Sequence, residues 1–114
     1  MSNLRYERVD PLTKSELVSQ LESLDPEIVV TALYSATRYE EDWRWVQDKC
    51  LEYLKSPEVS IRWAAATCLG DLALFRRPLN VERVAPALEL AIQDSTIADP
   101  ASFSLSMVKE FSNA

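Results

Sequence analysis

A short internal repeat constrains the fold of this chain more than any other feature of its sequence. The pattern Leu-Glu-x-Leu at 21–24 recurs 30 residues later at 51–54, and Pro-Glu followed by a β-branched residue recurs 31 residues on. Repeats of this period are typical of helical hairpins, each of which buries its apolar faces only against the next hairpin. We therefore expect a single domain, residues 1–114, built from hairpins at about 12–39, 40–74 and 80–112.

The spacing of apolar residues predicts an all-α chain. These residues recur at intervals of three and four, and a single glycine leaves no Asn-Gly hairpin turn. Asp25-Pro26 and Ser56-Pro57 each end one helix and begin the next, and Asn80 is positioned to cap another. The expected helices cover residues 13–24, 27–38, 43–54, 58–74, 81–93 and 100–112.

The same periodicity predicts which residues face the core. The predicted core residues are Leu17, Val18, Leu21, Leu24, Trp43, Val46, Cys50, Leu54, Ile61, Ala65, Cys68, Leu69, Leu72, Val84, Leu88, Ala91 and Ile92. Both cysteines belong to this set, so we expect them to be reduced and buried. Free cysteines, together with the absence of an export signal, favour a cytoplasmic protein.

Composition excludes several classes of function. With 18 acidic and 12 basic side chains, the chain has a net charge of −6, which disfavours nucleic acid and anionic membranes as ligands and favours a basic protein partner. The chain has no histidine, so the commonest general base near neutral pH is missing. No spacing typical of a metal site or of a Gly-rich phosphate loop occurs, and we expect neither metal nor cofactor.

Residues 56–72 resemble the second half of a HEAT repeat. The shared features are a proline at the start, an aliphatic-Arg pair at Ile61-Arg62, adjacent alanines, and Leu-Gly-x-Leu at the end. Ser56 stands where the family prefers Asp, and Ile61 where it prefers Val.

The other hairpins keep less of the HEAT pattern. The first has Asp25-Pro26 but Thr31 where the family has Arg, and the third keeps only Asp99-Pro100. The resemblance implies a short α-solenoid of about three hairpins, whose second helices line a concave partner-binding surface, and it does not imply an enzyme. It also implies that Arg62 pairs with an acidic residue of the preceding hairpin, Asp25 or Glu27.

An acidic stripe on the third predicted helix is the candidate partner site. Glu41, Trp45, Asp48 and Glu52 are spaced by four, three and four residues, which places them on one helix face. A tryptophan among carboxylates is typical of an interface hot spot for a basic partner. The alternative is that Trp45 packs against the N-terminal segment near Tyr6 or the next hairpin. The predicted partner-binding residues are Glu40, Glu41, Asp42, Trp45, Asp48, Glu52, Tyr34, Arg38 and Asp71.

Other aromatic residues also admit two interpretations. Trp63 lies off the main apolar stripe of its helix, and packing within the core is preferred to exposure on the concave wall. Phe103, Met107 and Phe111 end the array, where a core face is preferred to a dimer contact or a partner site.

Two classes of function fit these features. The first is a protein inhibitor that covers a basic partner. HEAT-like repeats occur among bacterial immunity proteins, which this chain is similar to in size and charge, so its specific form is an immunity protein against a nuclease toxin. The second is a HEAT-type adaptor that docks a peptide or a subunit. An enzyme, such as a HEAT-like lyase that attaches pigments to proteins, is disfavoured because no nucleophile-base pair can be named.

Overall fold

Six α-helices make up the computed structural model, which describes residues 9–111, and no strand occurs in that range. The helices are α2 (Lys14–Leu21), α3 (Pro26–Tyr39), α4 (Trp43–Tyr53), α5 (Val59–Leu74), α6 (Val81–Ala91) and α7 (Ala98–Phe111). The all-α class predicted from the sequence is confirmed. Residue 112, placed at the end of the last predicted hairpin, lies outside the described residues.

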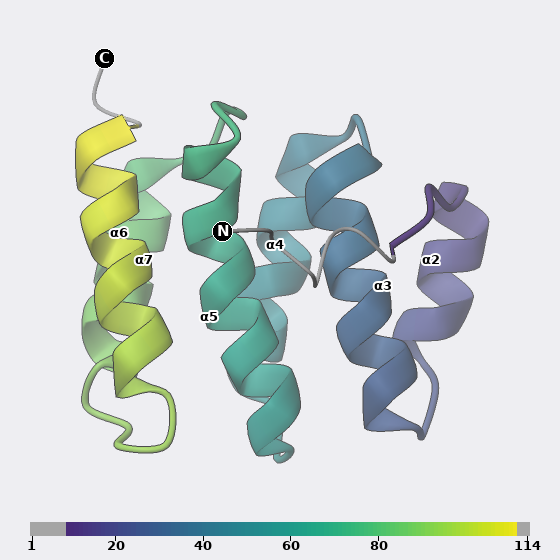
Figure 1. The fold of residues 1–114 in the computed structure, drawn as a ribbon, viewed down its shortest axis with the longest axis horizontal. Helices are drawn as coiled ribbons and strands as arrows, with labels where there is room; N and C mark the ends of the chain where they lie inside the picture. The colour runs from purple at the N-terminus through teal and green to yellow at the C-terminus, as the bar shows by residue number, and fades with distance from the viewer. Residues whose placement is uncertain (1–8, 112–114) are drawn as a thin grey trace.

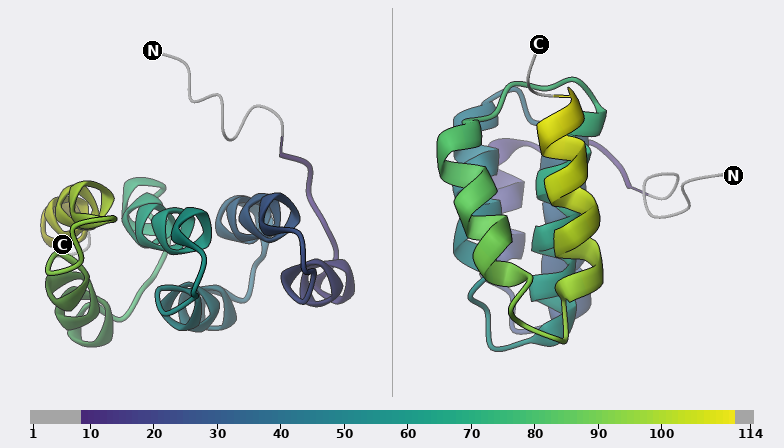
Figure 2. Two further views of the ribbon diagram at one scale, coloured as in Figure 1. Left: turned by 90° about the horizontal axis from the view of Figure 1, so that it is seen from below. Right: turned by 90° about the vertical axis from the view of Figure 1, so that its left-hand side faces the viewer.

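The helices are arranged in two layers. One layer contains α3, α5 and α7, and the other contains α2, α4 and α6, so that each pair of consecutive helices crosses from one layer to the other (Figure 2). The resulting hairpins, α2–α3, α4–α5 and α6–α7, lie side by side in chain order (Figure 1). The molecule measures 31 × 29 × 29 Å, so three hairpins form a block that is about as deep as it is wide.

Short polar side chains fix where four of the helices begin. Thr13, Asp25, Asp42 and Asn80 each accept a hydrogen bond from a backbone N–H of the first helical turn. Pro26 occupies the first position of α3. A backbone N–H at this position would form no hydrogen bond within the helix, so its absence in proline costs nothing there. The starts of α3 and α6 therefore fall within one residue of those predicted from the sequence.

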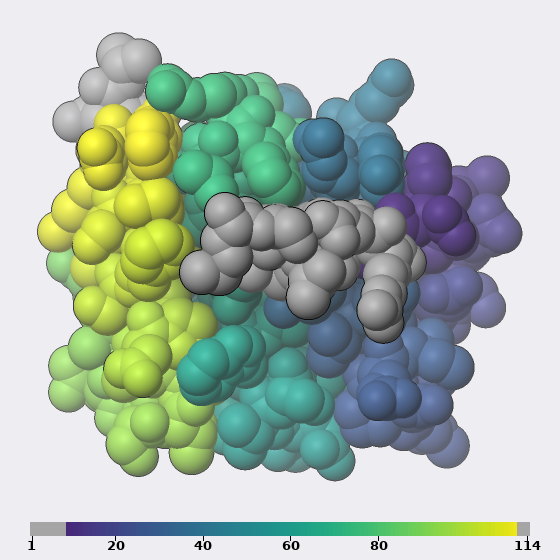
Figure 3. Space-filling view, in the orientation of Figure 1, coloured from purple at the N-terminus to yellow at the C-terminus, as the bar shows by residue number. Residues whose placement is uncertain are grey.

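The centre of the core is α5, which packs against α3 and α7 in its own layer and against α4 in the other. Its small residues let α7 approach closely. A Cβ atom added at Gly70 would lie 2.7 Å from the Cα of Ser104, and the Ser104 hydroxyl donates a 2.7 Å hydrogen bond to the carbonyl of Ala66. The side chains of α5 and α7 adjoin along the face shown in Figure 3.

Four apolar residues that were predicted or preferred for the core lie at the surface instead. Leu24 is fully exposed because α2 ends at Leu21, leaving Leu24 in the turn before α3. Val18 is 42% exposed on the outer side of α2. Trp63, on α5, and Phe103, on α7, are 45% and 62% exposed.

The connection from α5 to α6 is anchored to the end of α3. The guanidinium of Arg77 donates hydrogen bonds to the carbonyls of Thr37 at 2.6 Å and Ala36 at 3.3 Å, and another to the carbonyl of Glu40. The Ala36 carbonyl also accepts from the backbone N–H of Glu40, but the carbonyls of Thr37 and Glu40 are among the last four of the helix, which have no partner within it, and Arg77 satisfies them. Arg76 has a φ of 60°, which turns the chain at this point.

The two cysteines are free and buried, as the sequence predicted. Burial raises the pKa of the Cys68 thiol well above its usual value, which suppresses the reactive thiolate form. Within residues 9–111, none of the helices combines the length and the apolar character needed to cross a bilayer.

Candidate partner-binding site

Asp48 and Glu52 of the predicted acidic stripe lie on α4, whereas Glu41 precedes the helix and is not on its face. Both of these α4 carboxylates, and the neighbouring Asp42, are paired with cations of the same chain. The ion pairs are Lys14–Asp42 at 2.6 Å, Arg83–Asp48 at 2.7 Å and Lys49–Glu52 at 3.4 Å. Two of these cations come from α2 and α6, which flank α4. The charge of these carboxylates is therefore largely neutralised locally, although exposed ion pairs of this kind add little to the stability of a fold.

At the start of α4, the acidic residues have different roles. Asp42 caps the helix, and hydrogen bonds from Lys14 and from the backbone N–H of Trp45 hold the pKa of Asp42 below its usual value. Glu40 accepts a 2.8 Å hydrogen bond from the backbone N–H of Asp42. Glu41 is exposed and is in no ion pair among the described residues, so it remains available to a basic partner.

The ring of Trp45 is half-buried and is contacted by two cations of its own chain. The amino groups of Lys14 and Lys49 lie 5.1 and 5.9 Å from the ring centroid. A cation of a partner would have to displace these lysines to reach the ring. Tyr6, the alternative packing partner of Trp45, lies outside the described residues.

The predicted contact residues of the other layer are not all at the surface. Tyr34 is half-buried, and Arg38 is exposed with its guanidinium 5.0 Å from the ring centroid of Phe75 and 5.8 Å from that of Tyr39. Asp71 is only 3% exposed, because its helix, α5, is enclosed by α3, α4 and α7. Its inclusion among the surface contact residues is therefore wrong.

The predicted ion pair of Arg62 is also wrong. Its Nε lies 3.2 Å from a carboxylate oxygen of Asp94, in the hairpin that follows, and its Nη1 donates to the carbonyl of Ser56 at 2.8 Å. Asp25 instead accepts a hydrogen bond from the backbone N–H of Glu27 as the cap of α3. Arg62 thus connects its hairpin to the next one rather than to the preceding one.

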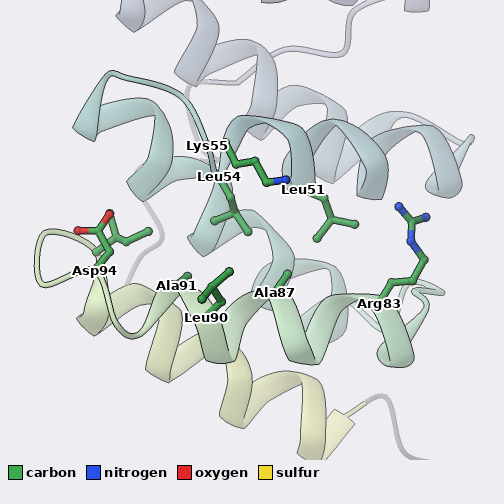
Figure 4. Close-up of a pocket in the computed structure, with 9 residues that line it drawn as sticks. Leu51, Leu54, Lys55, Arg83, Ala87, Leu90, Ala91 and Asp94 are labelled. Carbon is green, nitrogen blue, oxygen red and sulfur yellow. The ribbon is translucent and has the colours of Figure 1, made fainter.

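Sequence reasoning missed an apolar groove between α4 and α6, with a volume of about 470 Å³ (Figure 4). Its lining residues are Leu51, Leu54, Lys55, Arg83, Ala87, Leu90, Ala91, Asp94 and Ile97. The groove exists because α4 and α6 barely touch, in contrast to α5 and α7. Leu90 stands 72% exposed at its edge.

The sequence of α6 contains a signal that could have revealed this groove. Val84 and Leu88 form its buried side, so one apolar stripe already accounts for its packing. Ala87, Leu90 and Ala91 form a second apolar stripe on the adjacent side of the helix. A helix whose apolar face is wider than its contact with the core leaves part of that face for another surface.

Within residues 9–111, no three Cys, Asp or Glu side chains lie close enough together to hold a metal ion. The carboxylates of α4 instead face solvent or the cations described above.

A solved structure is similar to this chain over nearly its whole length. It is a chain in the crystal structure of a CDI complex from Cupriavidus taiwanensis LMG 19424, with a TM-score of 0.83 and 29% sequence identity. The match covers 93% of this chain and 96% of that chain. No model of a protein family matches the chain, and no curated protein matches it. In fold and in sequence, the chain is similar to a component of a CDI complex.

Proposed function

We propose that this chain is an immunity protein that binds and neutralises a toxin of a contact-dependent inhibition (CDI) system. The observation that carries the proposal is the similarity to the C. taiwanensis chain, at a TM-score of 0.83 and 29% identity. Because the match spans more than nine-tenths of both chains, it concerns the whole molecule rather than a single hairpin. CDI pairs a toxin with an immunity protein.

The chemistry of the chain supports the role of the immunity protein rather than that of the toxin. The sequence has no histidine, and burial of Cys68 raises the pKa of its thiol, which disfavours a nucleophilic role. The exposed carboxylates of α4 are held in ion pairs by neighbouring cations. Inhibition by covering the toxin needs contact area only, which this surface supplies.

We extend the proposal to a basic toxin of the nuclease type. Ion pairs within the chain neutralise the α4 stripe locally, but they leave the net charge of −6 unchanged. A nuclease must be basic to hold nucleic acid, and opposite net charges accelerate encounter between two proteins. An acidic inhibitor would approach such a toxin faster than a neutral one does.

The test uses the purified chain and the CDI toxin domains of the bacterium that encodes it. We expect one toxin domain to bind the chain, to lose its nucleic-acid cleavage, and to become harmless to cells that also produce the chain. Association should slow by about tenfold or more between low and high salt. If the chain binds none of these toxin domains and protects cells against none of them, the proposed function is refuted.

A second candidate, an adaptor that docks a peptide or a subunit, is favoured by the groove between α4 and α6. Apolar docking depends little on salt, in contrast to charge-driven association. Binding of an apolar helix without any protection against a toxin would support the adaptor.

A further inference from the structure

We propose that the groove between α4 and α6 is where the toxin binds, and that it receives an amphipathic helix of the toxin that carries a carboxylate. This inference rests on the proposed function and goes beyond it by naming the contact surface and the chemistry of the toxin element. It also assigns a role to the second apolar stripe of α6, formed by Ala87, Leu90 and Ala91, which lies beside the buried face of the helix.

The shape of the groove favours a helix over a single side chain. Its lining follows α6 from Arg83 to Ala91, which at 1.5 Å per residue corresponds to about 12 Å. A helix presents anchors at positions i, i+4 and i+7 over a similar length. Ala87 and Ala91 lie one turn apart on the α6 side, where their small side chains let a second helix approach closely.

The apolar side chains of the groove lie on both of its walls. Leu51 and Leu54 are half-buried on α4, and Leu90 is 72% exposed on α6, so an occupant would contact leucines from two helices (Figure 4). Covering exposed leucine surface with a partner removes apolar area from water, which contributes favourably to the free energy of binding. The occupant must therefore present aliphatic side chains.

The charges around the groove determine the polar group of the occupant. Arg83 is paired with Asp48, and Asp94 with Arg62, so two of the three charged lining residues are already compensated. Lys55 is exposed and takes part in none of the ion pairs among the described residues. Its ammonium group is the one uncompensated charge of the lining, and it calls for a carboxylate on the occupant.

The experiment measures the affinity of the toxin domain for three variants by titration calorimetry. Leu90→Asp places a charge at the apolar edge of the groove, and Lys55→Glu reverses the uncompensated charge. Phe103→Asp is the matched control, because Phe103 is a similarly exposed apolar residue on the opposite layer. All three side chains are exposed, so folding should be retained, and thermal melting of each variant verifies this.

We expect Leu90→Asp to weaken binding by about thirtyfold or more and Lys55→Glu by about tenfold. Phe103→Asp should change the affinity by less than about threefold. An unchanged affinity of folded Leu90→Asp, or a larger loss in Phe103→Asp, would overturn the inference while leaving the proposed function standing. If the unmodified chain binds none of the toxin domains, the proposed function itself fails.

The carboxylate is tested separately by charge exchange. Each acidic residue on the candidate helix of the toxin is changed to Lys and combined with Lys55→Glu. Recovery of most of the lost affinity in one combination would identify the partner of Lys55. Recovery in none of them would contradict the carboxylate part of the inference, even if Leu90→Asp weakens binding as expected.

Discussion

The two layers of this molecule are built from the same three hairpins, yet they pack differently. In the α3–α5–α7 layer, alanine, glycine and serine bring α5 and α7 into backbone contact, and aromatic rings such as Trp63 remain outside. In the α2–α4–α6 layer, α4 and α6 barely touch, and leucines line the space between them. Small residues therefore close one layer, while exposed and half-buried leucines line an open groove in the other.

Enlarging one residue in each layer should produce the largest difference in stability between the layers. Gly70→Ala forces a methyl group against the Ser104 backbone, which costs about 3 kcal/mol of overpacking and recovers about 1 kcal/mol of helix propensity. We expect the free energy of unfolding to fall by about 2 kcal/mol. Ala87→Leu, in the groove, should change it by less than about 0.5 kcal/mol. Urea denaturation measures both, and equal losses would show that the second layer is packed as tightly as the first.

The arginines that join hairpins sharpen the same contrast. Arg77 donates to three carbonyls at the end of α3, and hydrogen bonds to charged groups are the stronger kind, so Arg77→Met should cost about 1.5 kcal/mol of unfolding free energy. Arg83 makes an exposed ion pair with Asp48 in the open layer, and Arg83→Met should cost about 0.5 kcal/mol. Chemical denaturation of the two variants compares them, and a larger loss from Arg83→Met would contradict the prediction.

Acid should produce the smallest effect. Hydrogen bonds from Thr96 and the charge of Arg62 hold the pKa of Asp94 below its usual value of 3.8. A lowered pKa in the folded state stabilises the fold above the unfolded pKa, and this stabilisation is lost as the pH falls below about 4. The melting temperature should therefore drop between pH 5 and pH 3, and by less in Asp94→Asn. Glu41→Gln, which removes an unpaired carboxylate, is the control and should leave the size of the drop unchanged.

Local signals allowed much of the fold to be predicted. Asp25, Pro26 and Asn80 act through hydrogen bonds and backbone geometry within a few residues, which is why the starts of α3 and α6 could be placed closely. Leu24 was misplaced because the end of α2 has no comparable signal, and a leucine with the right spacing looked like a fourth core residue. The exposure of Trp63 could not be predicted either, because burial is set by how whole helices pack and not by signals within a few residues of the side chain.

Predicting the site was harder for a related reason. The acidic residues of α4 could be placed on one helix, but their compensation could not be foreseen, because Lys14 is 28 residues from Asp42 and Arg83 is 35 residues from Asp48. The groove exists because α4 and α6 are not packed closely against each other. A single sequence gives little information about which helices fail to pack together. The second apolar stripe of α6 was the one local trace of it.

Arg77 links the first hairpin to a segment that follows the second hairpin in the chain. Arg77 lies in the connection between the second and third hairpins, but its guanidinium binds carbonyls in the last turn of α3, which belongs to the first hairpin. Removing the α6–α7 hairpin together with this connection would leave the carbonyls of Thr37 and Glu40, at the end of α3, without the guanidinium that binds them. Through Arg77, the stability of the first hairpin therefore depends on the segment that leads into the third.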